Sequence, residues 1–494
     1  MAFHDLRGFL QRLEHRGDLL RVPVPISHEL ESTALCRQVL KAGGPALLMT
    51  QVQGSRHAQL GNLFGHRRRI EAALQGRPIA SLRELGKLLA GLRSPRWPGS
   101  LRAAMEQWPH FAQLAHVAPK RVHEATFEEV TIDGADIDLG RLPIQRCWSA
   151  DVGRLITFGL VITRGTRQQR QNLAIYRQQL IGPNRVIMRW LPHRGGARDY
   201  ADWCATYPDQ PFPLMVAIGA DPATMLAAVA PIPDNLSEYE FAGLLRAARS
   251  QVWHSPDTGL DAPAGAEILL EGHILPGDTA LEGPFGDHTG HYNAQDHFPV
   301  FTVTRVRMRR DAIYHGSYMG RSPDDEPSVL ASALNEVFVP LLQCTFPEIA
   351  DFYLPPAACS YRIALVSIRK EYPGHARRVM MAIWSYLRQF TYTKFVVVVD
   401  EDIDLRDADQ VLWAISTRAD PVRDVLRIEG TPIDYLDFAS PEPGLGGKLG
   451  LDATRKRGPE TRRPSSPEIL PDAAVEARMA TLWAALRTPT TMEA

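Results

Sequence analysis

The residues best suited to chemistry gather first in one stretch, residues 172–196, with the sequence NLAIYRQQLIGPNRVIMRWLPHRGG. Five polar or cationic side chains fall in and beside two short expected strands: Asn172, Arg177, Arg189, His193 and Arg194. A Gly-Pro-Asn turn at 182–184 joins the strands, and two glycines, Gly195 and Gly196, end the stretch. Such a hairpin can aim guanidinium forks and backbone N–H groups at a phosphate or a carboxylate. A solvated hairpin face accounts for the composition equally well.

A second stretch, EGPFGDHTG at residues 282–290, carries two acids separated by a turn. Pro284 and two glycines exclude a helix, so Glu282 and Asp287 are expected on a tight loop with His288 beside them. Two carboxyl groups held close together raise the pKa of one of them, which yields an acid able to deliver a proton near neutral pH. A turn with two solvated acids is the simpler alternative.

Glu238 lies in a third stretch, PDNLSEYEF at residues 233–241, where Ser237 and Glu240 have the spacing of a capping box. The helix dipole alone favours a glutamate in the first turn of a helix, so the position of Glu238 does not by itself indicate a ligand. His291 and His315 have no spacing that distinguishes them from structural histidines.

The elements that must position these groups indicate a multidomain α/β (α+β) protein. Residues 1–125 alternate helices and strands and predict an N-terminal α/β domain. Short β-branched and aromatic runs predict an antiparallel sheet or barrel within residues 126–320. Residues 321–453 return to an α/β pattern, in which four valines at 396–399 predict a strand buried on both faces of a parallel sheet. Residues 454–494 predict a linker and a terminal helix whose apolar stripe needs a partner, such as another subunit.

Composition excludes several classes of protein. The 494-residue chain has 55 Lys and Arg against 56 Asp and Glu, a formal charge of −1, so it lacks a basic field for holding nucleic acid. Its five cysteines have neither the CxxC nor the Cys/His spacing of a zinc site, and we expect reduced thiols in a cytoplasmic protein. The longest apolar runs are far shorter than the roughly 20 residues that span a bilayer, which leaves peripheral contact with the inner face of the cell membrane open.

Four strings together resemble the UbiD-type decarboxylases: residues 172–196, PDNLSEYEF, EGPFGDHTG, and TPIDYLDFASP at 431–441. The similarity runs in matching order from the first expected helix to about residue 455. It is closest to the bacterial branch that acts on 4-hydroxy-3-polyprenylbenzoate, and Asp287 favours that branch because cinnamate-type members carry a glutamate there. Ala174 replaces an expected glycine, and His291 replaces an expected aromatic residue.

The resemblance implies a split β-barrel, like that of flavin reductases, which holds prenylated FMN through a divalent metal, usually Mn²⁺, with K⁺ nearby. By motif position, the implied metal ligands are Asn172, His193 and Glu238. The implied cofactor contacts are Ile175, Tyr176, Arg177, Arg189, Trp190, Leu191, Arg194 and Gly195. The implied catalytic residues are Arg177, Glu282 and Asp287. Asn, Glu and phosphate oxygens suit a hard divalent ion, and one imidazole suits manganese or iron better than calcium.

The function that the resemblance implies is non-oxidative decarboxylation of 4-hydroxy-3-polyprenylbenzoate to 2-polyprenylphenol and CO₂ in ubiquinone biosynthesis. Decarboxylation leaves negative charge on a ring carbon, and this charge needs an electron sink. Ordinary side chains cannot act as that sink, whereas a modified flavin can. A flavin prenyltransferase would supply the cofactor, and the protein is expected as a homo-oligomer, dimer or hexamer, without nucleic acid. The alternatives are a UbiD-type decarboxylase or carboxylase of another hydroxyarene or unsaturated acid, a metal-dependent hydrolase, and a non-catalytic flavin- or RNA-binding barrel.

Overall fold

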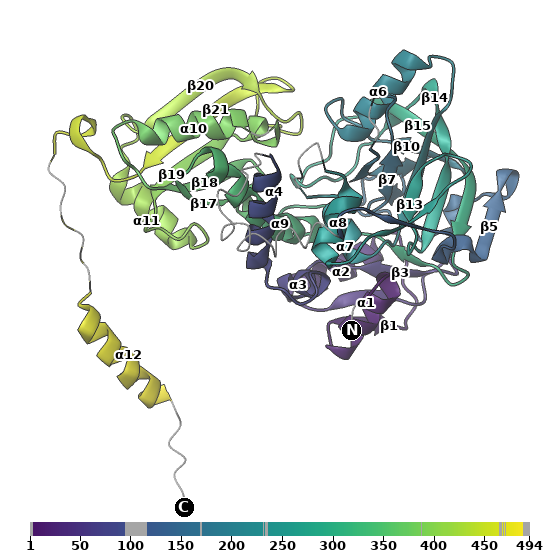
Figure 1. Cartoon of the computed structure of the whole chain (residues 1–494), viewed down its shortest axis with the longest axis horizontal. Coiled ribbons are helices and arrows are strands. Elements are labelled where there is room, and N and C mark those ends of the chain that lie inside the picture. The colour runs from purple at the N-terminus through teal and green to yellow at the C-terminus, as the bar shows by residue number, and fades with distance from the viewer. Residues whose placement is uncertain are drawn as a thin grey trace, which may run out of the picture.

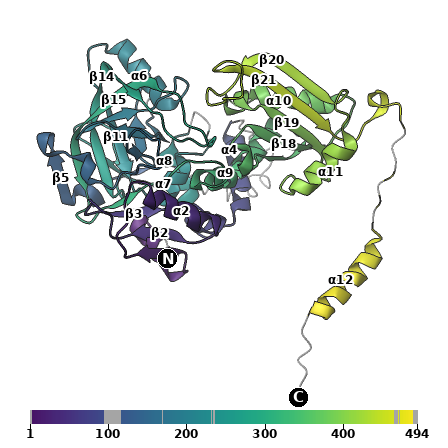
Figure 2. The same ribbon diagram turned by 180° about the vertical axis from the view of Figure 1, so that it is seen from behind.

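The computed structural model describes residues 3–93, 116–167, 170–230, 232, 236–386, 388–463, 467, 469 and 471–487. Figure 1 shows a β-rich unit that packs on the N-terminal elements, with a second α/β unit beside it. The view from behind shows the same arrangement (Figure 2). The helical structure expected between residues 94 and 115, and residues 233–235 of the PDNLSEYEF string, lie outside the described residues. The domain boundaries expected at 125, 320 and 453 stay a prediction.

The N-terminal elements form a small mixed sheet with helices packed on it. The helices are α1 (Leu6–His15), α2 (Glu31–Lys41), α3 (Arg67–Ala73) and α4 (Leu82–Arg93). The strands are β1 (Leu19–Val22), β2 (Ala46–Met49), β3 (Ala58–Gly61) and, from much later in the chain, β16 (Ile313–His315), in the order β1-β2-β3-β16. Asp5 caps α1 by accepting the N–H of Gly8, and the apolar face of α1 is buried.

The central unit is a curled antiparallel half-barrel, which confirms the fold expected from the sequence. Its strands are β5 (Val130–Asp133), β6 (Leu155–Ile156), β7 (Leu160–Thr163), β8 (Asn172–Ile175), β9 (Gln178–Leu180), β10 (Arg185–Met188), β11 (Phe212–Ile218), β14 (Ile268–Glu282) and β15 (Asp296–Met308). The order is β6-β9-β10-β15-β14-β11-β7-β8, with β5 paired to β15. The two longest strands, β14 and β15, pair with each other and are joined by the loop 283–295.

The chain crosses the half-barrel between β8 and β9. The sequence predicts one strand over residues 172–178, but the structure has two, because β8 pairs with β7 at one end of the sheet whereas β9 pairs with β6 and β10 near the other end. The break falls at Tyr176 and Arg177, the two residues that join these strands. Arg177 is therefore placed where the two ends of the curled sheet approach each other.

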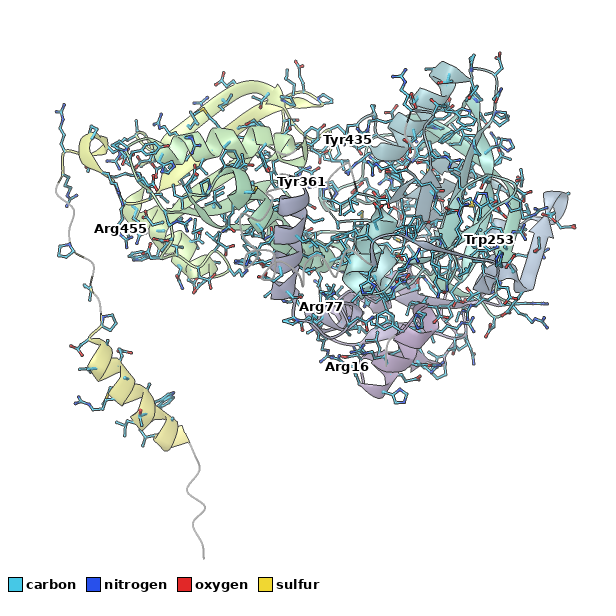
Figure 3. The ribbon with its side chains drawn as sticks, viewed as in Figure 1. Arg16, Arg77, Trp253, Tyr361, Tyr435 and Arg455 are labelled. Carbon is cyan, nitrogen blue, oxygen red and sulfur yellow. The ribbon has the colours of Figure 1, made fainter. Side chains whose placement is uncertain are left out.

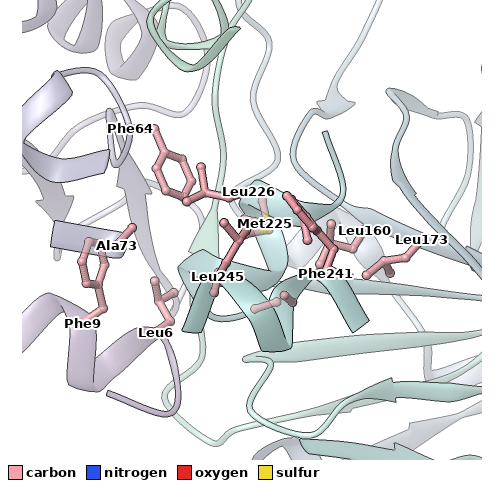
Figure 4. Packing of buried hydrophobic residues seen from close by; sticks show 14 of the residues in the cluster. Leu6, Phe9, Phe64, Ala73, Leu160, Leu173, Met225, Leu226, Phe241 and Leu245 are labelled. Atoms are coloured by element: carbon pink, nitrogen blue, oxygen red, sulfur yellow. The ribbon is translucent and has the colours of Figure 1, made fainter. Parts of the chain in front are cut away.

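Helices and a small sheet cover the half-barrel. They are α6 (Gly195–Thr206), α7 (Pro222–Ala227), α8 (Glu238–Arg246), β4 (Lys120–Val122), β12 (Gln251–His254) and β13 (Asp261–Pro263). The capping box predicted at Ser237 and Glu240 is present at the start of α8. One apolar core joins α7 and α8 to the N-terminal elements, whereas Ala197, Tyr200 and Trp203 of α6 pack on the core of the half-barrel. Figure 4 shows Phe9 and Phe64 on one side of the shared core with Leu226 and Phe241 on the other.

The C-terminal unit is a mixed sheet with helices on it. Its elements are α9 (Glu326–Thr345), β17 (Ile349–Tyr353), β18 (Ile363–Ile368), α10 (His375–Tyr386), β19 (Phe395–Asp400), α11 (Ala408–Arg418), β20 (Val425–Pro432) and β21 (Leu445–Ala453), with the strand order β17-β18-β19-β21-β20. β19 lies between β18 and β21 and is parallel to both. Val396, Val398 and Val399 are buried, which confirms the interior parallel strand predicted from the run of valines.

One described helix, α9, has the length and composition to span a bilayer, with a mean hydropathy of 1.2. It instead packs against α4 and β17, and 56% of the apolar window is buried inside the molecule. Leu330, Leu334 and Val337 on α9 belong to the core shared with the N-terminal elements. The apolar character of α9 is thus explained by the packing of a core helix.

The terminal helix α12 (Ala473–Arg487) forms as the sequence predicts and stands apart from the folded body in both views (Figures 1 and 2). Its apolar stripe is exposed, as in Trp483 at 61% and Leu486 at 70%. The partner subunit expected for this stripe stays a prediction.

Candidate functional site

A buried ion cluster occupies the point where the chain crosses between β8 and β9. Arg177 donates two hydrogen bonds to Glu282, from Nε to Oε1 at 2.8 Å and from Nη2 to Oε2 at 3.0 Å. Its Nη1 donates to Oδ2 of Asp287 at 2.7 Å, and its guanidinium lies over the ring of Phe285. The side chains of Glu282 and Asp287 are 0% and 4% exposed. The structure therefore brings together the three residues expected to be catalytic.

The loop 283–295 supplies the acids of this cluster. Glu282 is the last residue of β14, and Gly283 follows with a φ of +83°, a conformation that side chains with a Cβ rarely adopt. Asn293 braces the turn, because its Oδ1 accepts the N–H of Phe285 and its Nδ2 lies 3.4 Å from Glu282. The loop is therefore braced by hydrogen bonds, and its two acids are buried. The alternative of a turn with two solvated acids is not what the structure shows.

Asp287 has surroundings on both carboxylate oxygens that favour its charged form. Oδ1 lies 2.7 Å from Nδ1 of His288 and also accepts the backbone N–H of His288 at 2.7 Å. Burial alone raises the pKa of Asp287, but the hydrogen bond with His288 and the charges of Arg177, His288 and Arg189 hold this pKa well below its usual range. The expectation that close carboxylates raise the pKa of this acid is wrong here, because arginines lie between and beside them.

Arg189 is a second cation at the cluster, and it is bound less closely. It follows β10, and its guanidinium lies 3.6 Å from Glu282 and 3.9 Å from Asp287. Burial and the neighbouring charge of Arg177 lower the pKa of Arg189 to about 10. Its Nε is buried and has no hydrogen-bond partner among the residues that the structure describes. A buried arginine with spare donors is typical of an anion-binding site.

Aromatic side chains from the C-terminal unit cover this cluster. Arg189 lies over the ring of Tyr435 at 5.1 Å, His193 packs against Tyr392 at 5.6 Å, and His291 packs edge-on to Phe438 at 6.1 Å. Figure 3 shows Tyr435 and Tyr361 on the side of the C-terminal unit that faces the half-barrel, with Arg455 at its far end.

The spacing of these aromatic residues in the sequence does not indicate that they cover the site. Tyr435 and Phe438 lie in the TPIDYLDFASP string, so the string is the sequence signal for this part of the site. Asp434 in the same string accepts a hydrogen bond from the hydroxyl of Tyr361 at 2.9 Å. This bond ties the string to the segment that precedes β18. The site is therefore built from both units.

The expected cofactor contacts lie on three adjoining segments. Ile175 ends β8 and is half-buried, Trp190 is buried against Tyr176 and Tyr200, and Leu191 packs beside the ends of β10 and β15. The hydroxyl of Tyr176 accepts the backbone N–H of Gly196 at 3.1 Å. This contact ties the crossing of the half-barrel to the start of α6.

The N-terminus of α6 lies against the side chain of Asn172. Arg194 is the N-cap residue and Gly195 is the first helical residue, where a Cβ would overlap the amide oxygen of Asn172. Only glycine therefore fits, and the amide group of Asn172 lies against the first turn of the helix. A helix N-terminus beside arginines has the right polarity for a phosphate group.

Two of the three expected metal ligands, Asn172 and Glu238, lie near the start of β8, where Asn172 is the first residue of the strand and Glu238 contacts the second. Glu238 begins α8, and its Oε2 accepts the N–H of Leu173 at 3.2 Å, a contact that the helix dipole alone does not explain. Burial raises the pKa of Glu238 to about 7. A carboxylate whose charged form is destabilised by burial fits a role as ligand to a hard divalent cation.

His193, the third expected ligand, is half-buried two residues before Gly195, and its ring faces Tyr392. The described residues contain no group of three His, Cys, Asp or Glu side chains that would hold a metal by themselves. The expected metal site would therefore also need the amide oxygen of Asn172 and the phosphate group of the cofactor. The roles of all three ligands stay a prediction.

Family models match the chain over most of its length. The core model, described as the 3-octaprenyl-4-hydroxybenzoate carboxy-lyase Rift-related domain, matches residues 120–322. The N-terminal and C-terminal domain models of the same carboxy-lyase match residues 10–89 and 328–453. The chain belongs to the UbiD family. This membership makes the protein an enzyme of the carboxy-lyase class and confirms the family resemblance of the sequence strings.

Solved structures of UbiD-class enzymes share the whole fold. Vanillic acid decarboxylase of Sedimentibacter hydroxybenzoicus, in its closed form, is 26% identical with a TM-score of 0.83, and the match covers 99% of this chain and 100% of that one. HmfF of Pelotomaculum thermopropionicum, in complex with FMN, is 29% identical with a TM-score of 0.78, and the match covers 94% and 97%. The 3,4-dihydroxybenzoic acid decarboxylase of Enterobacter cloacae is 22% identical over 97% and 100% with a TM-score of 0.77, which shows the fold alone.

Proposed function

We propose that this UbiD-family member decarboxylates 4-hydroxy-3-polyprenylbenzoate to 2-polyprenylphenol and CO₂, without oxidation, in ubiquinone biosynthesis. The observation that carries the proposal is the fork of Arg177 between Glu282 and Asp287 at the crossing of the half-barrel. This cluster combines a carboxylate-binding cation with an acid that reaches the same point. Prenylated FMN, when bound, supplies the electron sink for the charge that departing CO₂ leaves behind.

Arg177 orients the substrate carboxylate in this proposal. Its planar fork already binds two carboxylates, and one of these contacts can be exchanged for the carboxylate of the substrate. Glu282 holds the guanidinium in place through two hydrogen bonds. Asp287 then protonates the ring carbon from which CO₂ has left.

The residues along the crossing suit a flavin phosphate held through a metal. Asn172, Glu238 and His193 would bind Mn²⁺, and Arg194 and Gly195 at the start of α6 would bind the phosphate together with it. The remaining flavin contacts would come from residues 175–177 and 189–191, with K⁺ nearby. In support, the HmfF structure contains FMN, and an evolved dimeric form of HmfF contains prFMN.

The substrate class is supported more strongly than the individual substrate. The neighbour named for vanillic acid acts on a hydroxylated aromatic acid, which supports a decarboxylase of aromatic acids. The test is to co-express the protein with a flavin prenyltransferase and to identify the product formed from 4-hydroxy-3-polyprenylbenzoate. We expect 2-polyprenylphenol, and conversion of vanillate-like acids with no conversion of the prenylated acid would contradict the assignment of the substrate.

The exposed stripe of α12 supports self-association. Val475, Met479, Leu482, Trp483 and Leu486 are all exposed on this helix, so a second subunit is the simplest cover for them. Deleting the residues after 465 should lower the oligomeric state or the solubility. A full-length chain that is monomeric by light scattering at micromolar concentration would contradict this proposal. We also expect a cytoplasmic enzyme, with contact to the membrane surface where a polyprenylated acid resides.

A further inference from the structure

One proton must enter the site in every turnover of the proposed reaction. When a carboxylate R–COO⁻ loses CO₂, the electron pair of the broken C–C bond stays on the carbon, which takes up one proton to become R–H. Asp287 delivers this proton and is left as a carboxylate. Because Asp287 is only 4% exposed, its proton must be replaced through a neighbouring group.

His288 is the neighbour placed to replace it. Nδ1 of His288 lies 2.7 Å from Oδ1 of Asp287, whereas Oδ2 of Asp287 faces Arg177 at 2.7 Å. An arginine does not release its proton in a protein, so the contact on Oδ2 orients Asp287 but supplies nothing. An imidazole both gains and releases a proton near neutral pH.

The exposure of the two side chains gives the direction of transfer. The side chain of His288 is 18% exposed against 4% for Asp287. Within the described part of the chain no hydrogen bond holds Nε2 of His288, so the ring can turn toward solvent. Asp325, the N-cap of α9, is a second carboxylate near His288.

We propose that His288 carries protons from solvent to Asp287, an inference that rests on the proposed decarboxylase function. When the substrate carboxylate takes over the contact of Arg177 with Oδ2 of Asp287, Arg177 no longer stabilises the charged form of Asp287 directly, and the imidazolium gives its Nδ1 proton to Oδ1 and becomes the neutral Nε2–H form. A solvent proton returns to Nδ1 when the ring turns outward, and the imidazolium is restored. One proton passes per CO₂ released, and no oxidant or reductant takes part.

The test is His288→Asn in the enzyme loaded with prenylated FMN. The amide N–H of asparagine can replace the Nδ1–H hydrogen bond to Asp287 but cannot carry a proton. We expect kcat to fall about 100-fold, the lower end of what general acid–base groups contribute, with KM and flavin absorbance unchanged. Added imidazole should restore turnover in proportion to its protonated form, and D₂O should slow the variant more than the wild type.

His291→Asn is the matched control, because its ring lies in the same loop and packs on Phe438. It should show wild-type kcat without any response to imidazole. A His288→Asn enzyme within twofold of wild-type kcat, or a loss that imidazole does not restore and D₂O does not enlarge, would overturn the relay. A wild-type enzyme that releases no CO₂ from any aromatic acid overturns the proposed function itself, and the two failures are thereby distinguished.

Discussion

Two buried charge clusters in this protein look similar in composition and differ in how their charges are matched. The barrel cluster consists of Arg177, Arg189, Glu282, Asp287 and His288. The edge cluster lies where parallel strands of the C-terminal sheet end and consists of Lys370, Asp400, Asp402, Arg418, Asp452, Thr454, Arg455, Lys456 and Glu460. The carboxyl ends of parallel strands are where α/β sheets commonly bind ligands, so position alone favours the edge cluster as a site.

The cations of the edge cluster are held closely. Lys370 contacts Glu460 at 2.7 Å and Thr454 at 2.8 Å, and Arg418 contacts Asp400 at 3.0 Å and Asp402 at 2.8 Å. Burial alone lowers the pKa of Arg418, but the hydrogen bond and charge of Asp402 raise it above its usual value. Such a cluster stabilises the sheet edge.

The barrel cluster leaves one cation incompletely matched. Arg189 lies 3.6 Å from its nearest carboxylate, and its pKa is lowered, which is the opposite of Arg418. The difference teaches that a dense group of charges indicates a ligand site where its carboxylates do not offset the burial of a cation, as at Arg189 and unlike at Arg418. The following variants test this distinction, because changes in the barrel cluster and beside it should alter chemistry, and changes in the edge cluster should alter stability.

The largest effect is expected from Glu238→Ala and His193→Ala, which should each lose both the metal and the flavin and thus all activity. The reason is that, in the proposed site, the metal would hold the phosphate together with the arginines. Metal analysis and flavin absorbance of the purified variants measure this. Glu240→Ala is the control, because Glu240 only caps the same helix, and it should keep both. Normal flavin content without bound metal in either variant would contradict the ligand assignment.

Asp287→Asn should lower turnover about 100- to 10,000-fold while flavin binding survives, because the amide cannot deliver a proton. Exchange of the ring hydrogen of the product with solvent deuterium should fail in parallel, since the same group removes that proton in reverse. Asp452→Asn in the edge cluster is the control. It should lower the free energy of unfolding by about 3 kcal/mol with kcat of the folded enzyme unchanged. If Asp287→Asn decarboxylated at a rate near that of the wild type, Asp287 would only be a residue of the turn and not the acid.

Arg177→Lys should lower kcat/KM about 100-fold, because an ammonium group cannot reproduce the two parallel hydrogen bonds of the fork and leaves the carboxylate misoriented. Steady-state kinetics with the flavin content measured in parallel are the check. Arg418→Lys, the equivalent change in the edge cluster, should lower Tm and leave kcat/KM unchanged. Equal kinetic losses in both variants would remove the distinction between the clusters.

The smallest effect is expected from Asp402→Asn. Hydrogen bonds from Arg418, despite burial, lower the pKa of Asp402 from 3.8 to about 2, so its charged form stabilises the fold above pH 3.8. Because the side chain is 38% exposed, solvent screening reduces this contribution to about 1 kcal/mol at pH 7. The urea midpoint of the variant should be lower at pH 7, and the difference should shrink as the pH falls from 3.8 toward 2. A constant difference across that range would contradict the ion-pair origin.

Local patterns in the sequence were sufficient wherever the determining interactions are short in range. The capping box at Ser237 and Glu240, the apolar face of α1 and the run of valines in β19 each predict the element that forms. The four strings that resemble the UbiD-type decarboxylases predict the family, which the family models confirm. These features depend on residues within a few positions of one another, so their spacing is visible in the sequence itself.

The tertiary structure decided how the site is assembled. Arg177 meets Glu282 and Asp287 across 105 and 110 residues, and it does so because the expected strand 172–178 breaks to join both ends of the curled sheet. The same contacts reverse the expected direction of the pKa of Asp287, and the C-terminal unit brings Tyr435 over Arg189. The sequence alone determined which chemical groups are present and which local elements carry them. Their distances, and therefore their charges, were set by the closure of the half-barrel, because electrostatic and packing energies depend on separation in space and not along the chain.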